Sequence, residues 1–123
     1  MFKLFSSIAI ALLLVSIASC THKTDLSGLK EVSFSNDIQP ILSGNCTQSN
    51  CHAGNGRLFS LTTYDDVINE GHVKAGDPHG SELYQTISNN LLATTMPSFP
   101  QPSLTTDQIK LIYTWILQGA KNN

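Results

Sequence analysis

Two cysteines and a histidine lie within seven residues, and no other feature constrains this chain as strongly. Cys46 and Cys51 are separated by four residues, and His52 directly follows the second cysteine. These side chains suit three kinds of site: a disulfide that closes a small loop, a zinc centre, which needs about four ligands, or covalent attachment of haem. The usual haem motif places two residues between its cysteines. Taken alone, the wider spacing favours the disulfide.

Outside its N-terminal segment, the chain carries little material for a hydrophobic core. Fourteen of the first 19 residues are hydrophobic, which leaves 36 among residues 20–123. A domain with so few hydrophobic residues gains stability from a disulfide, a metal or a large apolar cofactor. Without Lys3 the chain holds six basic and nine acidic residues, a net charge of −3. It has no basic footprint, and we therefore expect no nucleic-acid partner.

The N-terminal segment Met1–Cys20 has the pattern of an export signal. Lys3 stands near its start, the apolar run Ile8–Ile17 is short for a membrane span, and small residues follow. A permanent signal anchor is the alternative. The ending Ile17-Ala18-Ser19-Cys20 resembles a bacterial lipobox. The lipobox implies cleavage before Cys20 and lipidation of its thiol, whereas cleavage by the ordinary signal peptidase would leave that thiol free.

These features predict a chain in three parts. Residues 1–19 form the cleaved lipoprotein signal peptide, residues 20–32 a lipidated polar tether, and residues 33–123 one domain. Acyl chains on Cys20 would hold the domain at a membrane of the bacterial cell envelope, facing the periplasm or the surface. Thr21 slightly favours the outer membrane. Outside the cytoplasm, cysteines persist as disulfides or in covalently modified form.

Apolar periodicity predicts helices and no strands in the domain. A first helix is expected over Asn36–Ser43, capped by Ser35. Pro40 lies near its middle, so the helix must be short or must have Pro40 in its first turn. Further helices are expected over Thr63–Glu70, with capping residues and acidic side chains at its start, and over Ser81–Ile87.

The last helix has the clearest pattern. Thr105 and Gln108 form a capping box. Apolar residues then recur at helical spacing, and Gly119 marks the end. The stripe consists of Ile109, Ile112, Tyr113 and Ile116, and Leu117 and Ala120 widen it.

Met96 is the one methionine after Cys20. It lies in a long loop, Asn89–Ser103, with no apolar stripe around it, and Pro97 follows directly. A lone methionine often fills a gap in a core. A haem iron commonly takes a methionine sulfur as its sixth ligand, and the rigid backbone at Pro97 suits holding one sulfur in place.

At this point the sequence resembles a known family, the small bacterial c-type cytochromes with a widened Cys-x4-Cys-His attachment site. Each matching stretch is short, but together they run in family order and cover nearly all of residues 34–120. The stretches are Phe34–Leu42, Cys46–His52, Ala75–Pro78, Ser81–Tyr84, Met96–Pro97 and Leu104–Ala120.

The resemblance implies an all-α, cytochrome c-like fold in which a few short helices wrap one covalently bound haem. Cys46 and Cys51 would hold the haem, His52 would be the proximal iron ligand and Met96 the distal ligand. His72 or His79 in place of Met96 stays open, and His22 lies in the tether. Arg57 and Lys74 are candidate partners of the haem propionates.

A buried haem would also complete the lean core. We expect the apolar residues Ile38, Leu42, Leu83, Ile112 and Trp115 to pack against it, and we expect the haem-free chain to fold poorly.

The function that these features predict is electron transfer rather than catalysis, by a monomer that docks transiently with redox proteins. One alternative is a haem-based sensor or binding module in which Met96 leaves and a small ligand binds. Another is a lipoprotein without haem that is stapled by a Cys46–Cys51 disulfide.

Overall fold

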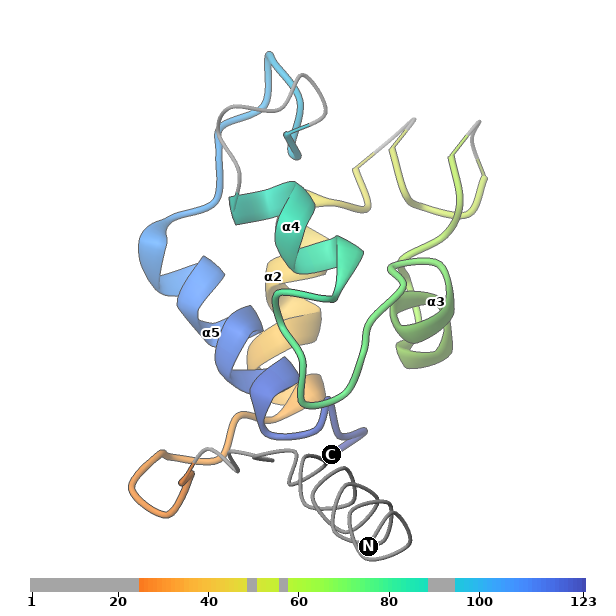
Figure 1. Cartoon of the computed structure of the whole chain (residues 1–123). Helices are drawn as coiled ribbons and strands as arrows, with labels where there is room; N and C mark the ends of the chain where they lie inside the picture. The colour runs from red at the N-terminus through yellow and green to blue at the C-terminus, as the bar shows by residue number, and fades with distance from the viewer. Residues whose placement is uncertain (1–24, 49–50, 56–57, 89–94) are drawn as a thin grey trace, which may run out of the picture.

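The computed structural model describes residues 25–48, 51–55, 58–88 and 95–123. Its helices are η1 (Phe34–Ile38), α2 (Gln39–Asn45), α3 (Tyr64–Asn69), α4 (Glu82–Ser88) and α5 (Thr106–Leu117) (Figure 1). No strand occurs in these ranges, so the prediction of an all-α chain is confirmed. Both the predicted signal peptide and Cys20 lie outside the described residues. None of the described helices is long and apolar enough to cross a membrane.

The first helix begins earlier than the sequence predicted. Its cap is Ser33, not Ser35, and the Ser33 hydroxyl accepts from the backbone N–H of Asn36. The first turn, η1, is a wide π-helical turn, in which the N–H of Ile38 donates to the carbonyl of Ser33. Pro40 then falls in the first turn of α2, where its missing N–H costs no helical hydrogen bond.

A backbone hydrogen bond joins the start of α4 to the end of α3. Of the two threonines expected as the cap of α3, Thr62 and Thr63, the structure selects Thr63, which forms a capping box with Asp66. Gly71 follows α3, and a Cβ atom at Gly71 would collide with the carbonyl oxygen of Val67. The N–H of Leu83 donates to the carbonyl of Gly71 at 2.9 Å, so the start of α4 lies beside the end of α3.

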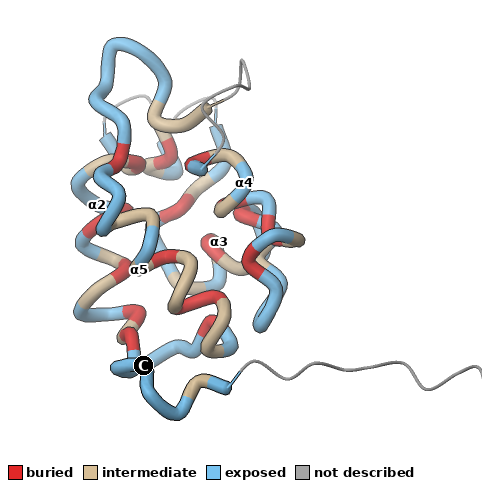
Figure 2. The backbone as a smooth tube through the Cα atoms, turned by 60° about the vertical axis from the view of Figure 1, so that its left-hand side comes forward, coloured by how far each residue is buried: buried red, intermediate tan, exposed pale blue. Residues whose placement is uncertain are grey.

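Helix α5 confirms the predicted capping box. The Thr105 N–H donates to Gln108 Oε1 at 2.9 Å, and the Gln108 N–H donates to Thr105 Oγ1 at 3.2 Å. The buried face of α5 comprises Ile112, Trp115 and Ile116. The helix packs against η1 and α4. Figure 2 shows the buried residues where the helices face one another.

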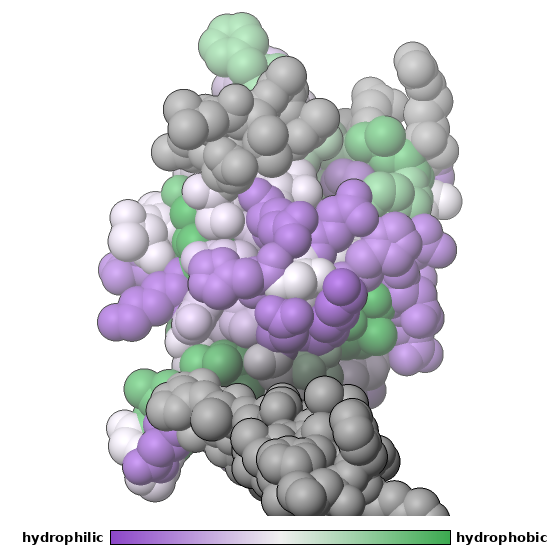
Figure 3. Space-filling model, in the orientation of Figure 1, coloured by the Kyte–Doolittle hydropathy of each residue, from purple (hydrophilic) through white to green (hydrophobic). Residues whose placement is uncertain are grey.

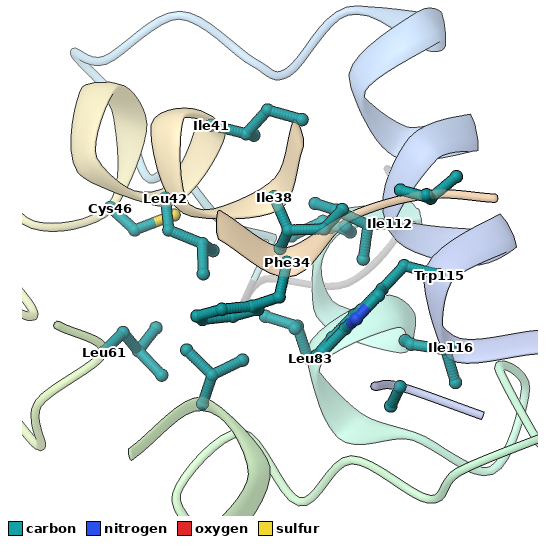
Figure 4. Close-up of a cluster of buried hydrophobic side chains, with 14 of the residues drawn as sticks. Phe34, Ile38, Ile41, Leu42, Cys46, Leu61, Leu83, Ile112, Trp115 and Ile116 are labelled. Atoms are coloured by element: carbon teal, nitrogen blue, oxygen red, sulfur yellow. The ribbon is translucent and has the colours of Figure 1, made fainter. Parts of the chain in front are cut away.

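One hydrophobic cluster spans the domain, from Val32 to Ala120. Phe34 lies at its centre, with its ring centroid 5.5 Å from that of Trp115 and 5.2 Å from that of Tyr64. Cys46 lies at the edge of this cluster beside Leu42 (Figure 4). The core therefore fills the space between the helices and reaches the predicted attachment motif.

Both ends of the described chain lie at the same end of the molecule (Figure 1). Gln118, just after α5, bonds the last residues of the predicted tether, accepting from the N–H of Val32 and donating to the carbonyl of Lys30, each at 2.9 Å. Asn123 Oδ1 accepts from the N–H of Phe34 at 2.9 Å. These contacts fix the point at which the chain upstream of Lys30 leaves the domain.

Candidate functional site

The attachment motif forms a closed loop at the end of α2. The N–H of Cys46 donates to the carbonyl of Leu42 at 2.7 Å and so continues the helix by one residue. The N–H of His52 donates back to the carbonyl of Cys46 at 3.0 Å. This bond returns the chain to the helix end, which places His52 and both cysteines in one neighbourhood.

The two cysteines are separate thiols in unlike surroundings. Cys46 is buried and Cys51 is half-buried. Burial, and secondarily the nearby Cys51 thiol, raise the pKa of Cys46 to about 11. Across the described ranges, no three side chains of His, Cys, Asp or Glu come together as a metal site.

His52 is held in one orientation by the backbone. Its side chain is buried, and Nδ1 lies 2.9 Å from the carbonyl oxygen of Phe59. Because a carbonyl only accepts, Nδ1 carries the proton of the neutral ring, and Nε2 is left with its lone pair. The Phe59 ring also contacts the imidazole, with centroids 4.5 Å apart. No hydrogen bond joins Nε2 to any described residue.

A cavity of about 280 Å³ brings these residues to the predicted distal ligand. Cys46, His52 and Met96 all line it. Its other walls are mostly apolar side chains, with a few polar groups near α3 and α4. They are Leu58, Phe59, Leu61, Leu83 and Ile87, with Glu70, Gly71, Glu82 and Thr86. Its size is close to the lower end of ligand pockets, about 300–1,000 Å³.

Met96 reaches the cavity from a segment without helical structure. Its N–H donates to the carbonyl of Thr86 on α4 at 3.1 Å. The Met96–Pro97 peptide bond is cis. Helix α4 therefore positions the methionine, and it contributes Thr86 and Ile87 to the same cavity wall.

The other described histidines do not line the cavity, although His72 contacts Glu82, which does. His72 is exposed, and its Nδ1 lies 2.7 Å from Glu82 Oε2. His79 is exposed and lies against Tyr84 and Tyr113, with ring centroids at 5.5 and 5.8 Å. Neither lines the cavity, and Met96 alone of the three candidates does. His22 lies outside the described residues.

Two further expectations are corrected. Lys74 does not line the cavity, because its backbone N–H is bonded to Ser81 Oγ and the loop runs toward the far end of α5. Arg57, the other propionate candidate, lies outside the described residues. Of the five apolar residues expected to pack on haem, only Leu83 lines the cavity. The other four are buried in the core: Ile38, Leu42, Ile112 and Trp115.

Three of the four residues expected to hold haem line the same mostly apolar cavity: the Cys46 thiol, the His52 imidazole with a free Nε2 lone pair, and the Met96 thioether. Cys51, the fourth, is half-buried and does not line the cavity. Sequence reasoning missed the Phe59 carbonyl and the carboxylates of Glu70 and Glu82. A backbone acceptor carries no side-chain pattern, and the carboxylates reach the cavity only through the contact between α3 and α4.

Comparison with protein families, with curated proteins and with solved structures found no match for this chain.

Proposed function

We propose that this protein is a c-type cytochrome that carries electrons at a membrane of the bacterial cell envelope. One haem would be attached covalently through Cys46 and Cys51, and Cys20 would carry the lipid. The observation that supports this function best is the shared cavity. His52 and Met96 are far apart in sequence, yet both line one apolar cavity together with Cys46.

Each residue has a distinct role in this proposal. Haem supplies a one-electron ferric–ferrous couple when it is bound. The S–H groups of Cys46 and Cys51 would each add across one vinyl group, which forms two thioether bonds without any leaving group. His52 Nε2 and Met96 Sδ would take the two axial positions.

The bond between His52 and Phe59 supports the role of His52. Histidines that bind metals commonly donate their other ring N–H to a carbonyl or a carboxylate, which fixes the tautomer and the ring orientation. His52 makes this bond through Nδ1. If His52 and Met96 both held the iron, no position would remain open for a substrate, which would favour electron transfer over catalysis, and a methionine ligand would raise the reduction potential.

The intact mass of the protein under denaturing, reducing conditions tests the proposal. Residues 20–123 are produced in a periplasmic host that matures c-type cytochromes. We expect a mass raised by one haem, and the bare polypeptide mass for the double variant Cys46→Ala/Cys51→Ala. A bare polypeptide from the unaltered chain, while a control cytochrome matures in the same cells, would refute the proposal and favour the disulfide-stapled lipoprotein.

The distal ligand separates a carrier from a sensor. With Met96 bound, the reduced protein should resist carbon monoxide at neutral pH. Met96→Ala should open the position and allow carbon monoxide to bind, and Met96→His should close it again at a lower potential. Carbon monoxide binding by the unaltered protein would favour the sensor.

A further inference from the structure

Two exposed apolar side chains line the cavity, and a third belongs to the segment that carries Met96. In the described ranges the large exposed hydrophobic residues are Leu29, Leu58, Phe59 and Phe99. Leu58 and Phe59 line the cavity and are 41% and 46% exposed. Phe99 follows Met96 by three residues and is 96% exposed. Figure 3 shows hydrophobic surface on the upper end of the molecule, where Figure 1 places these two segments.

The carboxylates of Glu70 and Glu82 line this mouth, and no described lysine does. Glu82 contacts the exposed His72, whose Nδ1 lies 2.7 Å from Glu82 Oε2, so Glu70 is the carboxylate without a cationic partner among the described ion pairs. Arg57 lies outside the described residues, and even when it is counted the two carboxylates outnumber it. Lys30, Lys74 and Lys121 lie near the end of α5, where the last tether residues meet it. Lys110 lies in the first half of α5 and lines a different cavity, together with Lys30.

The tether leaves from the end opposite the mouth. Lys121 Nζ lies 2.9 Å from Glu31 Oε1, and Gln118 bonds the backbone of Lys30 and Val32. The segments that carry Leu58, Phe59, Phe99, Glu70 and Glu82 lie away from this point (Figure 1). We call the face formed by these five residues the mouth face.

We propose that the mouth face docks a protein partner whose own surface is apolar at its centre and carries lysine or arginine around it. The inference rests on the proposed electron-transfer function, since this face surrounds the cavity assigned to haem. Opposite charges steer a partner into contact and fix its orientation, and a small apolar centre suits a transient complex. Anionic lipid surfaces and nucleic acids carry the same sign as Glu70 and Glu82 and are disfavoured as occupants.

Three organic ions separate the apolar contribution from the charge contribution. Tetraphenylphosphonium is apolar and cationic, tetramethylammonium is cationic without aromatic surface, and tetraphenylborate matches the first ion in shape with the opposite charge. Each is titrated into the reduced, haem-loaded protein, and backbone amide NMR signals are followed. We expect tetraphenylphosphonium to shift the signals of Leu58, Phe59 and Phe99 at lower concentration than either of the other ions.

The variants test the charge directly. Glu70→Gln together with Glu82→Gln should weaken tetraphenylphosphonium binding roughly two- to fivefold, as expected for exposed charges. Glu31→Gln removes the same charge at the tether end and should leave the binding unchanged. High salt should reduce the difference between the two ions of like shape, because it screens exposed charges.

Preference for tetraphenylborate at these signals, or shifts confined to the tether end, would overturn the inference. The proposed function fails separately, through an intact mass that lacks haem. The titration reports the sign and the apolar character of the face whether or not electrons pass through it.

Discussion

At the scale of single residues, we expect the Cys46 thiol to react more slowly than the Cys51 thiol. Burial raises the pKa of Cys46 to about 11, and only the thiolate attacks an alkylating reagent. At pH 8 about one Cys46 side chain in a thousand is a thiolate. In the reduced, haem-free protein we therefore expect iodoacetamide to modify Cys46 at least about tenfold more slowly than the more exposed Cys51.

The pH dependence of the alkylation rate tests whether the raised pKa of Cys46 is the cause. The rate at Cys46 should keep rising as the pH approaches 11, because the thiolate fraction grows up to that pKa. Peptide mass spectrometry after timed alkylation measures both sites. In urea, where burial is lost, the two rates should converge. Equal rates in the folded protein at pH 8 would show that Cys46 is not buried in solution.

Residue types and spacing predicted part of this site and could not predict the rest. Cys46, Cys51, His52 and Met96 were predicted because thiols, an imidazole and a thioether are the side chains that haem chemistry uses; Cys46, His52 and Met96 line one cavity, whereas Cys51 does not. Four further residues were candidates for the distal ligand or for partners of the haem propionates. His72, His79 and Lys74 do not line the cavity, because contacts between loops decide such positions and no local pattern encodes them. Arg57 lies outside the described residues.

At the scale of elements, local chemistry predicted helix ends where ordinary α-helical geometry holds. Thr105 and Gln108 bond each other as the predicted capping box. For α3 the sequence predicted a threonine cap, Thr62 or Thr63, and the capping box of Thr63 with Asp66 is added by the structure. The prediction for the first helix was wrong by two residues. Ser33 and Ser35 are equivalent candidates in the sequence, and the wide turn of η1, in which Ser33 also donates its N–H to Asp37, selects Ser33.

The cap of α5 predicts a measurable loss of stability. Thr105→Ala removes the acceptor for the Gln108 N–H and should lower the free energy of unfolding by about 1 kcal/mol, which is roughly 4–8 °C in melting temperature. Thr106→Ala is the matched control, since Thr106 is the first helical residue and not the cap. Thermal melts of the haem-loaded variants measure the difference. Equal losses in both would mean that the cap bond does not stabilise α5.

At the scale of the whole molecule, the domain has two unequal halves. The buried side chains of Ile38, Ile112 and Trp115 belong to one cluster between η1 and α5, away from the cavity. The cavity lies where Cys46, Leu61, Leu83 and Ile87 form the edge of that cluster. The sequence pointed to a core packed against haem throughout, whereas in the structure most of the buried residues contact other helices and only a few of them line the cavity.

The stability of the haem-free chain follows from that division. An empty cavity of about 280 Å³ would cost up to about 7 kcal/mol at roughly 24 cal/mol per Å³ if it stayed dry, and less once water enters from its open side. We expect the unaltered chain made without haem to melt more than about 10 °C below the haem-loaded chain. Using one sequence for both samples avoids the packing change that cysteine substitutions would add.

Hydrogen exchange shows which helices are destabilised when haem is absent. In the haem-free sample, amide protection should fall most in α4 and in the segment around His52 and Leu61, because these form the cavity walls. Protection in α5 should persist longer, because Ile112, Trp115 and Ile116 keep their contacts in the helix cluster. Equal melting temperatures with and without haem would contradict the placement of haem in this cavity. Uniform loss of protection, with α5 opening as readily as α4, would instead show that haem supports the whole core, as the lean composition of the sequence first suggested.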